Sequence, residues 1–313
     1  MTAVITGLPS YFARSIPVVA AEQERLYGAL RKQHRRLRGT KGAGRRPDPF
    51  LFLGSDRPVA RREHRVVASQ FAVPLLVPPE LRPFLGRSKA VRSAASDGIA
   101  RLDAALGMAK DIGALRWIRQ VVRLVVLFRG GKRNSFYNPS AHGAVFIRLD
   151  RHCDDLHVFE ELVHQSCHAF FSILLCREPP LVRDQHSTLS AAFDVDGHDR
   201  NVLVALHGLV TEAVISDALF RLAASRPNLQ SAVIGRLAFC LAKFGADLNA
   251  ALRAKRLLTN RGMRWLCTMA CTYDQIVKAL APELLRVDLT GQPYVFDPEL
   301  FRRRNAWLAT SHS

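Results

Sequence analysis

The sequence predicts a mainly α protein with a small β element, an α+β composition in which helices dominate. Apolar residues recur at helical spacing through three long segments, and proline or polar residues end each of them. These segments are residues 156–176, 201–225 and 232–254. A strand is predicted most clearly over residues 143–149, where a short β-branched run follows turn residues.

The N-terminal part is basic and rich in residues that interrupt regular structure. Residues 18–38 predict an amphipathic helix that becomes increasingly basic, and residues 39–49 place Gly and Pro among basic side chains, which is typical of a flexible loop. Residues 74–83 predict a Pro-rich connector. We therefore expect a basic N-terminal extension over residues 1–70 and a helical domain, which carries the metal-binding motif described below, over residues 71–313.

The remaining segments alternate between helical spacing and less regular sequence. Residues 90–108 have small and apolar residues at helical spacing, whereas the apolar run at 117–128 fits either a helix or a strand. Residues 183–200 predict a polar loop rich in Asp and His. Towards the C-terminus we expect one or two helices within residues 259–280, an irregular tail after Pro282, and a final ordered segment at residues 298–308.

The composition indicates a polyanionic or acidic partner. The 313 residues carry a net charge of +18, which favours binding to nucleic acid or to an acidic peptide. Nucleic acid is disfavoured without being excluded, because the basic residues are dispersed and no aromatic side chains interleave the first basic run. A solvated basic surface is the alternative. The chain shows neither a signal peptide nor an uninterrupted apolar run of about 18 residues, so we expect a cytoplasmic protein with no membrane span and six reduced cysteines.

The most informative motif is His-Gln-Ser-Cys-His at residues 164–168. A helix turns by about 100° per residue, so His164 and His168 point the same way, and Glu161 shares their face. Metallopeptidases with this spacing have Glu directly after the first His, where it acts as the general base. Gln165 occupies that position and cannot take a proton from a metal-bound water. The motif therefore predicts a metal site between two long helices, without the hydrolytic base.

A catalytic metal needs a third ligand, and His207, in the next long helix, is the first candidate. Glu212 is the second candidate, and His186 and His198 in the polar loop are further alternatives. Glu161 begins a Glu-x-x-His pair, as in di-iron bundles, but such a site needs a second pair on a facing helix. We therefore expect Glu161 to orient a ligating histidine. The opposing interpretation is that the paired histidines are structural core residues.

Four segments follow one another in a fixed order within roughly residues 134–265. They are the strand sequence at 143–147, residues 159–168 (Phe-Glu-Glu-Leu-Val-His-Gln-Ser-Cys-His), residues 200–208 (Arg-Asn-Val-Leu-Val-Ala-Leu-His-Gly), and Leu-Thr-Asn-Arg-Gly at 258–262. Together they resemble the HExxH-type iron/2-oxoglutarate-dependent peptide β-hydroxylases, which accompany gene clusters for ribosomally made, modified peptides. The sequence departs from this family at Gln165.

The resemblance implies that His164, His168 and His207 bind Fe(II), with 2-oxoglutarate and O₂ as co-substrates. It also implies a cationic anchor for the 2-oxoglutarate carboxylate, for which Arg200 is the first candidate and Arg183 the second. The expected reaction is hydroxylation of an unactivated C–H bond in a peptide or amino-acid side chain during natural-product biosynthesis.

An acidic precursor peptide would suit the basic surface, because complementary charge accelerates encounter. Such an oxygenase needs no base beside its first ligand, so Gln165 is more compatible with oxygen chemistry than with hydrolysis. The alternatives are a zinc-binding, metallopeptidase-like protein that is inactive as a hydrolase, and a non-enzymatic basic protein that binds nucleic acid.

Overall fold

A computed structural model of the chain divides by its internal contacts into two compact units. One unit comprises Arg14–Lys110 and Leu115–Cys176, and the other comprises Met1–Ala13, Asp111–Ala114 and Arg177–Ser313. Most of the predicted N-terminal extension lies outside the described residues, so the boundary near residue 70 stays a prediction. The structure describes residues 15–25, 50–53, 73–76, 92–93, 96–122, 124–129, 134–138, 143–149, 153–177, 180–184, 201–293 and 295–310.

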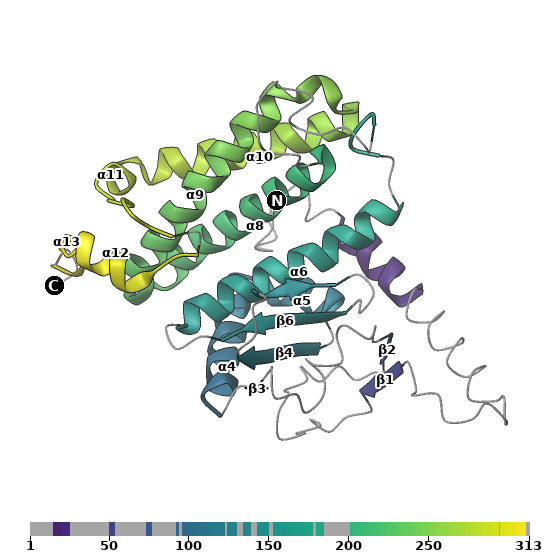
Figure 1. Cartoon of the computed structure of the whole chain (residues 1–313), viewed down its shortest axis with the longest axis horizontal. Coiled ribbons are helices and arrows are strands. Elements are labelled where there is room, and N and C mark those ends of the chain that lie inside the picture. The colour runs from purple at the N-terminus through teal and green to yellow at the C-terminus, as the bar shows by residue number, and fades with distance from the viewer. Residues whose placement is uncertain are drawn as a thin grey trace. The chain divides into compact units, whose positions relative to one another are not determined.

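The predicted fold class is confirmed: the described part of the chain is mainly helical and contains a small mixed sheet (Figure 1). We call Arg14–Lys110 with Leu115–Cys176 the sheet unit and the other the bundle unit. The sheet unit begins with a helical segment at residues 16–25, which starts two residues before the helix predicted for 18–38; residues 26–38 lie outside the described residues.

The central strands of the sheet unit are buried and parallel to each other. Four described strands lie in the order β3 (Arg92–Ser93), β4 (Leu124–Arg129), β6 (Ala144–Arg148) and β5 (Phe136–Tyr137). β4 and β6 are parallel, with Leu124 opposite Ala144, whereas the outer pairs are antiparallel. Nearly every residue of β4 and β6 is buried, as expected for parallel strands covered on both faces.

The structure resolves the ambiguous apolar run at residues 117–128. It forms both elements, first helix α5 (Leu115–Val121) and then strand β4, with the predicted strand at 143–149 pairing beside it as β6. The second half of the run is rich in Val, which suits a strand buried on both faces. The spacing of apolar residues alone does not distinguish such a strand from a buried helix. A further departure is a strand, β2 (Val73–Leu76), paired with β1 (Phe50–Leu53), at the start of the expected Pro-rich connector. A two-stranded ribbon has edges at which Pro74 is tolerated.

Helix α6 (Asp155–Arg177) runs along the sheet and carries the predicted motif (Figure 1). Its apolar face is buried, and Phe170 makes an edge-on contact with Trp117 of α5, with ring centroids 6.0 Å apart. The helix begins after Asp154, whose Oδ1 accepts the His157 backbone N–H at 2.7 Å. Helix α4 (Ser96–Asp111), within which most of the predicted 90–108 segment lies, belongs mainly to the same unit.

The bundle unit is built on three long helices, α8 (Val202–Ser225), α9 (Gln230–Arg253) and α10 (Asn260–Ala279), at the predicted places. Two described helical segments, α8 and Pro227–Arg253, are long and apolar enough to cross a membrane by length and composition. Neither segment is an uninterrupted apolar run, which is why the sequence predicted no membrane span there. The most apolar windows of these segments are 67% and 56% buried inside the structure, and core helices pass the same test.

Hydrogen bonds to a backbone carbonyl join residues 180–184 to the start of α10. The Leu181 carbonyl oxygen accepts the Thr259 backbone N–H at 3.0 Å and lies 3.2 Å from the Thr259 hydroxyl. A Cβ at Gly262 would stand 2.1 Å from the same oxygen, so only glycine fits there. The Leu-Thr-x-x-Gly segment therefore has a structural function, which is to dock a helix N-terminus against another segment.

The C-terminal tail is more ordered than the sequence predicts. Short helices α11 (Ala281–Leu284), α12 (Pro298–Arg304) and α13 (Trp307–Thr310) follow α10, and α11 occupies part of the expected irregular tail. Asn305 is buried and exchanges two hydrogen bonds with the backbone of Asp288, at 2.8 and 2.9 Å. These bonds, which hydropathy patterns do not reveal, order the segment between α11 and α12.

Candidate functional site

A row of polar side chains follows α6 and the residue positions just before it. Spacings of three and four residues place them within roughly a third of the helix circumference, at about 100° per residue. We call this row the polar stripe, and it consists of Cys153, His157, Glu161, His164, Gln165 and His168. All six belong to the sheet unit, so their mutual geometry is defined.

The two motif histidines lie side by side, as their spacing predicts. The ring centroids of His164 and His168 are 4.9 Å apart and the rings are tilted by 37°. The side chain of His164 is 34% exposed, so a ligand from outside the helix can reach it. Glu161 Oε2 lies 3.9 Å from His164 Nδ1, too far for a hydrogen bond but on the side from which a carboxylate would orient the ring.

Glu161 has hydrogen-bond donors both on α6 and on a neighbouring segment. Gln165 Nε2 donates to Glu161 Oε2 at 3.0 Å, and the Ser135 hydroxyl also bonds the carboxylate. Burial by itself would raise the pKa of Glu161. The neighbouring His164 and His157, together with the hydrogen bonds from Gln165 and Ser135, outweigh burial and lower that pKa. Glu161 is therefore a carboxylate at neutral pH.

Gln165 is buried, with only 2% of its surface exposed, and its amide is used as a hydrogen-bond donor to Glu161. An amide has no proton-accepting group with a useful pKa, so this side chain supports the position of Glu161 and does not replace a general base. The metallopeptidase arrangement is thus absent at residue 165 both in chemistry and in hydrogen bonding.

Two participants in this site were not predicted from the sequence. Ser135 precedes β5, accepts the backbone N–H of Arg148 at 3.0 Å, and bonds Glu161. No local pattern links Ser135 to α6, because the contact depends on the pairing of β5 with β6. His157 lies four residues before Glu161, and extending the motif by one turn towards the N-terminus would have identified it.

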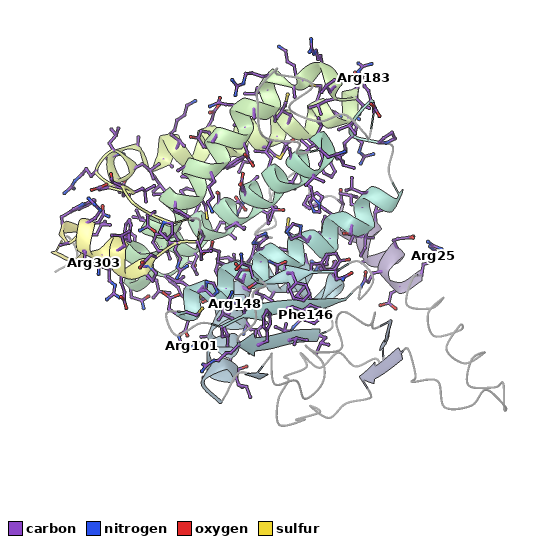
Figure 2. The ribbon with its side chains drawn as sticks, viewed as in Figure 1. Arg25, Arg101, Phe146, Arg148, Arg183 and Arg303 are labelled. Carbon is purple, nitrogen blue, oxygen red and sulfur yellow. The ribbon has the colours of Figure 1, made fainter. Side chains whose placement is uncertain are left out.

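His157 is held against the end of β6 (Arg148 is labelled in Figure 2). His157 Nε2 lies 3.3 Å from the Arg148 carbonyl oxygen, which can only accept, so Nε2 carries a hydrogen. Burial opposes the charged ring, but the hydrogen bond and charge of Cys153, followed by the charges of Glu161 and Glu160, raise the pKa of His157 to about 9. The ring is an imidazolium at neutral pH.

The remaining predicted ligands are described with the bundle unit. His207 is half-buried in the first turns of α8, and its carbonyl oxygen accepts from Thr211 Oγ1 at 2.9 Å. Glu212 is half-buried in the same helix. Both belong to the bundle unit, which is described separately from α6, so a ligand set joining either of them to the α6 histidines stays a prediction. Within the described part of the chain, no three His, Cys, Asp or Glu side chains are arranged to hold a metal ion.

The predicted 2-oxoglutarate anchors are only partly described. Arg200, like His186 and His198, lies outside the described residues. Arg183 is exposed in the bundle unit (labelled in Figure 2), where its Nε donates to the Leu258 carbonyl oxygen at 3.1 Å. Its guanidinium is therefore oriented by the same docking of residues 180–184 against α10 that Thr259 and Gly262 build.

The side chains of α6 fit one part of an Fe(II) or Zn(II) site. Two adjacent imidazoles, with a carboxylate on the Nδ1 side of one of them, supply two nitrogen ligands and a group that orients them. Comparisons with known proteins add no family: no protein-family model matches the chain, and no curated protein matches it either.

Proposed function

We propose that this chain is an Fe(II)/2-oxoglutarate-dependent oxygenase that hydroxylates an unactivated C–H bond of a peptide or amino-acid side chain. The observation that carries the proposal is the side-by-side pair His164 and His168, with Glu161 beside one ring. A carboxylate near Nδ1 favours the tautomer with hydrogen on Nδ1, which leaves Nε2 of His164 as the metal-binding nitrogen.

The state of Gln165 favours oxygen chemistry over hydrolysis. A zinc hydrolase of this type needs a carboxylate at that position to take a proton from water, whereas Gln165 donates its N–H to Glu161. Bound Fe(II) with 2-oxoglutarate and O₂ supplies an oxidant that needs no such base. In this proposal, Glu161 is a positioning residue: it accepts from Gln165 and Ser135, and its negative charge, 3.9 Å from His164 Nδ1, favours the ring orientation in which Nδ1 faces the carboxylate.

The proposal assigns the third ligand to His207 and the anchor of the distal carboxylate to Arg200, with Glu212 and Arg183 as the respective alternatives. A planar guanidinium binds a carboxylate through two parallel hydrogen bonds, which is why an arginine suits this function. The net charge of +18 supports an acidic peptide as the substrate-bearing partner.

Anaerobic titration tests the proposal directly. Fe(II) and 2-oxoglutarate added together are expected to give a visible metal-to-ligand charge-transfer band that neither gives alone, and O₂ is then expected to yield succinate. Both signals are expected to disappear in His164→Ala and to persist in His34→Ala, a histidine of the N-terminal region that serves as the matched control. A folded, iron-loaded protein without the band would refute the proposal.

The same preparations separate the alternative functions. Tight zinc binding without O₂-dependent 2-oxoglutarate turnover would indicate the inactive, metallopeptidase-like protein. Failure to bind any divalent metal, together with nucleic-acid binding that weakens steeply with salt, would indicate a non-enzymatic binding protein. His207→Ala and Glu212→Ala, compared by iron affinity, distinguish the two candidates for the third ligand.

A further inference from the structure

The outer side of α10 carries three sulfur-containing side chains that the proposed oxygenase chemistry does not use. Met263, Cys267 and Cys271 follow one another at intervals of four residues, which places successive members about 40° apart around the helix. Both cysteines are free and exposed, and Met263 is half-buried. We call these three residues the sulfur row.

Helix α10 holds the sulfur row in a fixed arrangement. At the start of the helix, the Gly262 N–H donates to the Thr259 hydroxyl at 3.2 Å, and the Met263 N–H donates to the Thr259 carbonyl oxygen at 2.9 Å. The opposite face of the helix is buried, with Trp265 and Met269 among its core residues. The whole row lies in the bundle unit, so its geometry does not depend on how the two units are placed.

The spacing of the two cysteines is too wide for a disulfide and suits an ion shared between them. Side chains four residues apart on a helix have Cβ atoms about 5–6 Å apart. A disulfide needs Cβ atoms about 3.5–4.5 Å apart, so oxidation would have to distort the helix. Two metal–sulfur bonds of about 2.3 Å each span sulfur atoms up to about 4.6 Å apart, which the thiols reach without such distortion.

We infer that Met263, Cys267 and Cys271 form a binding site for a monovalent copper ion, with the two cysteine sulfurs as the principal ligands and the Met263 thioether as the third. Thiolate and thioether ligands select soft ions such as Cu(I). Methionine has three rotatable bonds, so its sulfur can move to an ion held by the cysteines. The inference does not depend on the proposed oxygenase function, whose paired histidines belong to the sheet unit.

The set of ligands on this face favours a soft ion of low coordination number over zinc. Structural zinc sites take four ligands, almost always from Cys, His, Asp or Glu. Among the described residues, side chains of these four types form no group of three that could hold an ion. The third sulfur of the row comes from methionine, which is a ligand for Cu(I) and not one that zinc commonly uses.

Binding exchanges protons for the ion and moves no electrons. Cu(I) displaces one proton from each thiol, so two S–H bonds are replaced by two Cu–S bonds and two protons are released to solvent. The product carries one positive ion and two thiolates. Along α10, Arg264 and Asp274 are exposed three residues outside the cysteine pair, one at each end, so together they add no net charge and the sulfur ligands decide which ion binds.

Anaerobic titration of the reduced, metal-free, full-length protein with Cu(I) tests the inference. Bicinchoninate, a chelator that is coloured when it binds Cu(I), competes for the ion and reports the affinity. We expect one tightly held Cu(I) per chain and the release of two protons. After one equivalent of Cu(I), iodoacetamide labelling followed by peptide mass spectrometry should show Cys267 and Cys271 protected at least about tenfold together, by mass action, and Cys153 unprotected.

Variants of the row separate a shared site from two independent thiols. Cys267→Ser and Cys271→Ser should each lower the Cu(I) affinity at least about a hundredfold, and Met263→Leu, which keeps the side-chain volume, by about tenfold. The matched control is Cys271→Ser/Gln275→Cys, which keeps two exposed thiols but separates them by about 12 Å along the helix. It should bind Cu(I) no better than Cys271→Ser.

Two results would overturn the inference. One is Cu(I) binding by the moved-thiol control that is as tight as in the wild type, because the one-turn spacing would then be irrelevant. The other is an equivalent of Cu(I) that leaves the labelling rates of Cys267 and Cys271 unchanged. The substituted side chains are exposed or half-buried, so the variants are expected to fold, and circular dichroism checks this. The wild-type labelling decides the matter by itself.

Discussion

The hydrogen bond from Gln165 to Glu161 predicts the outcome of restoring the familiar motif by Gln165→Glu. The substitution puts a second carboxyl group where the amide nitrogen now lies 3.0 Å from Glu161 Oε2, in a position only 2% exposed. Two carboxylates at this distance cannot both stay ionised, so the variant must either bury two adjacent negative charges or keep one proton. A protonated carboxyl group can still donate to its neighbour and so preserves the original hydrogen bond.

The cost of keeping that proton sets the magnitude. An unfolded glutamate has a pKa of about 4.3, and holding its proton in the folded state costs about 1.4 kcal/mol for each pH unit above this value. We therefore expect Gln165→Glu to lower the free energy of unfolding by about 1 kcal/mol at pH 5 and by about 4.4 kcal/mol at pH 7.5. The sign follows because the new group has a raised pKa when folded, so stability is lost as pH rises.

Urea unfolding followed by circular dichroism at both pH values measures the effect on the metal-free protein. The matched control is the exchange Glu161→Gln/Gln165→Glu, which restores one amide donor and one carboxylate and should recover most of the stability at pH 7.5. Equal destabilisation at the two pH values, or an exchange variant no more stable than the single variant, would refute the argument. The same preparations show whether the restored motif has peptidase activity with zinc. Any such gain should be accompanied by the loss of stability described above.

Three further predictions concern other parts of the chain. Gly262→Ala places a Cβ 2.1 Å from the Leu181 carbonyl oxygen, so the backbone hydrogen bonds there must break. Urea unfolding should show the bundle unit destabilised by about 2–3 kcal/mol, whereas the exposed control Asn260→Ala should change its stability by under about 0.5 kcal/mol. The pKa of His157 is raised from 6.5 to about 9, so its contribution to the free energy of unfolding is complete below about pH 6.5 and lost towards pH 9. Between these pH values the free energy of unfolding of the wild type should fall by on the order of 2 kcal/mol more than that of His157→Gln. Binding of an acidic peptide, measured by fluorescence anisotropy, should weaken severalfold between about 50 and 200 mM salt; salt-independent binding would contradict recruitment by the basic surface.

The helices were predictable because their patterns are local. Apolar residues at helical spacing predicted α6, α8, α9 and α10, and Pro or polar residues marked the ends of these segments. The structure adds the N-cap of α8, Asn201, whose Oδ1 accepts the Leu203 N–H at 2.8 Å. The run at 117–128 was ambiguous because a short buried strand and a buried helix have the same composition. Its division into α5 and β4 depends on pairing with β6, which is tertiary information.

The candidate site was predictable where it follows the helix period, and only there. Spacing placed His164, His168 and Glu161 on one face, and the structure brings them close together. Spacing could not predict that Gln165 donates to Glu161 and not to a neighbouring segment, nor that Ser135 completes the carboxylate's environment. The Ser135 contact arises from strand order, which no short sequence pattern encodes, whereas Gln165 and Glu161 are one turn apart on the same helix and the spacing permits their bond without selecting it.

The backbone of Arg148, at the end of β6, contacts the N-terminal end of the polar stripe and, through Ser135, its central residue Glu161. Its N–H is accepted by Ser135, which bonds Glu161, while its carbonyl oxygen receives His157 and Cys153. Strand register has a period of two, so a slip of β6 by a single residue would remove both connections at once and turn its buried side chains outward. The pairing of β6 with its parallel neighbour β4 therefore positions both Glu161, which lies beside the histidine pair, and the thiol of Cys153. Insertions within β6 should consequently be tolerated far less than insertions in the loops that flank it.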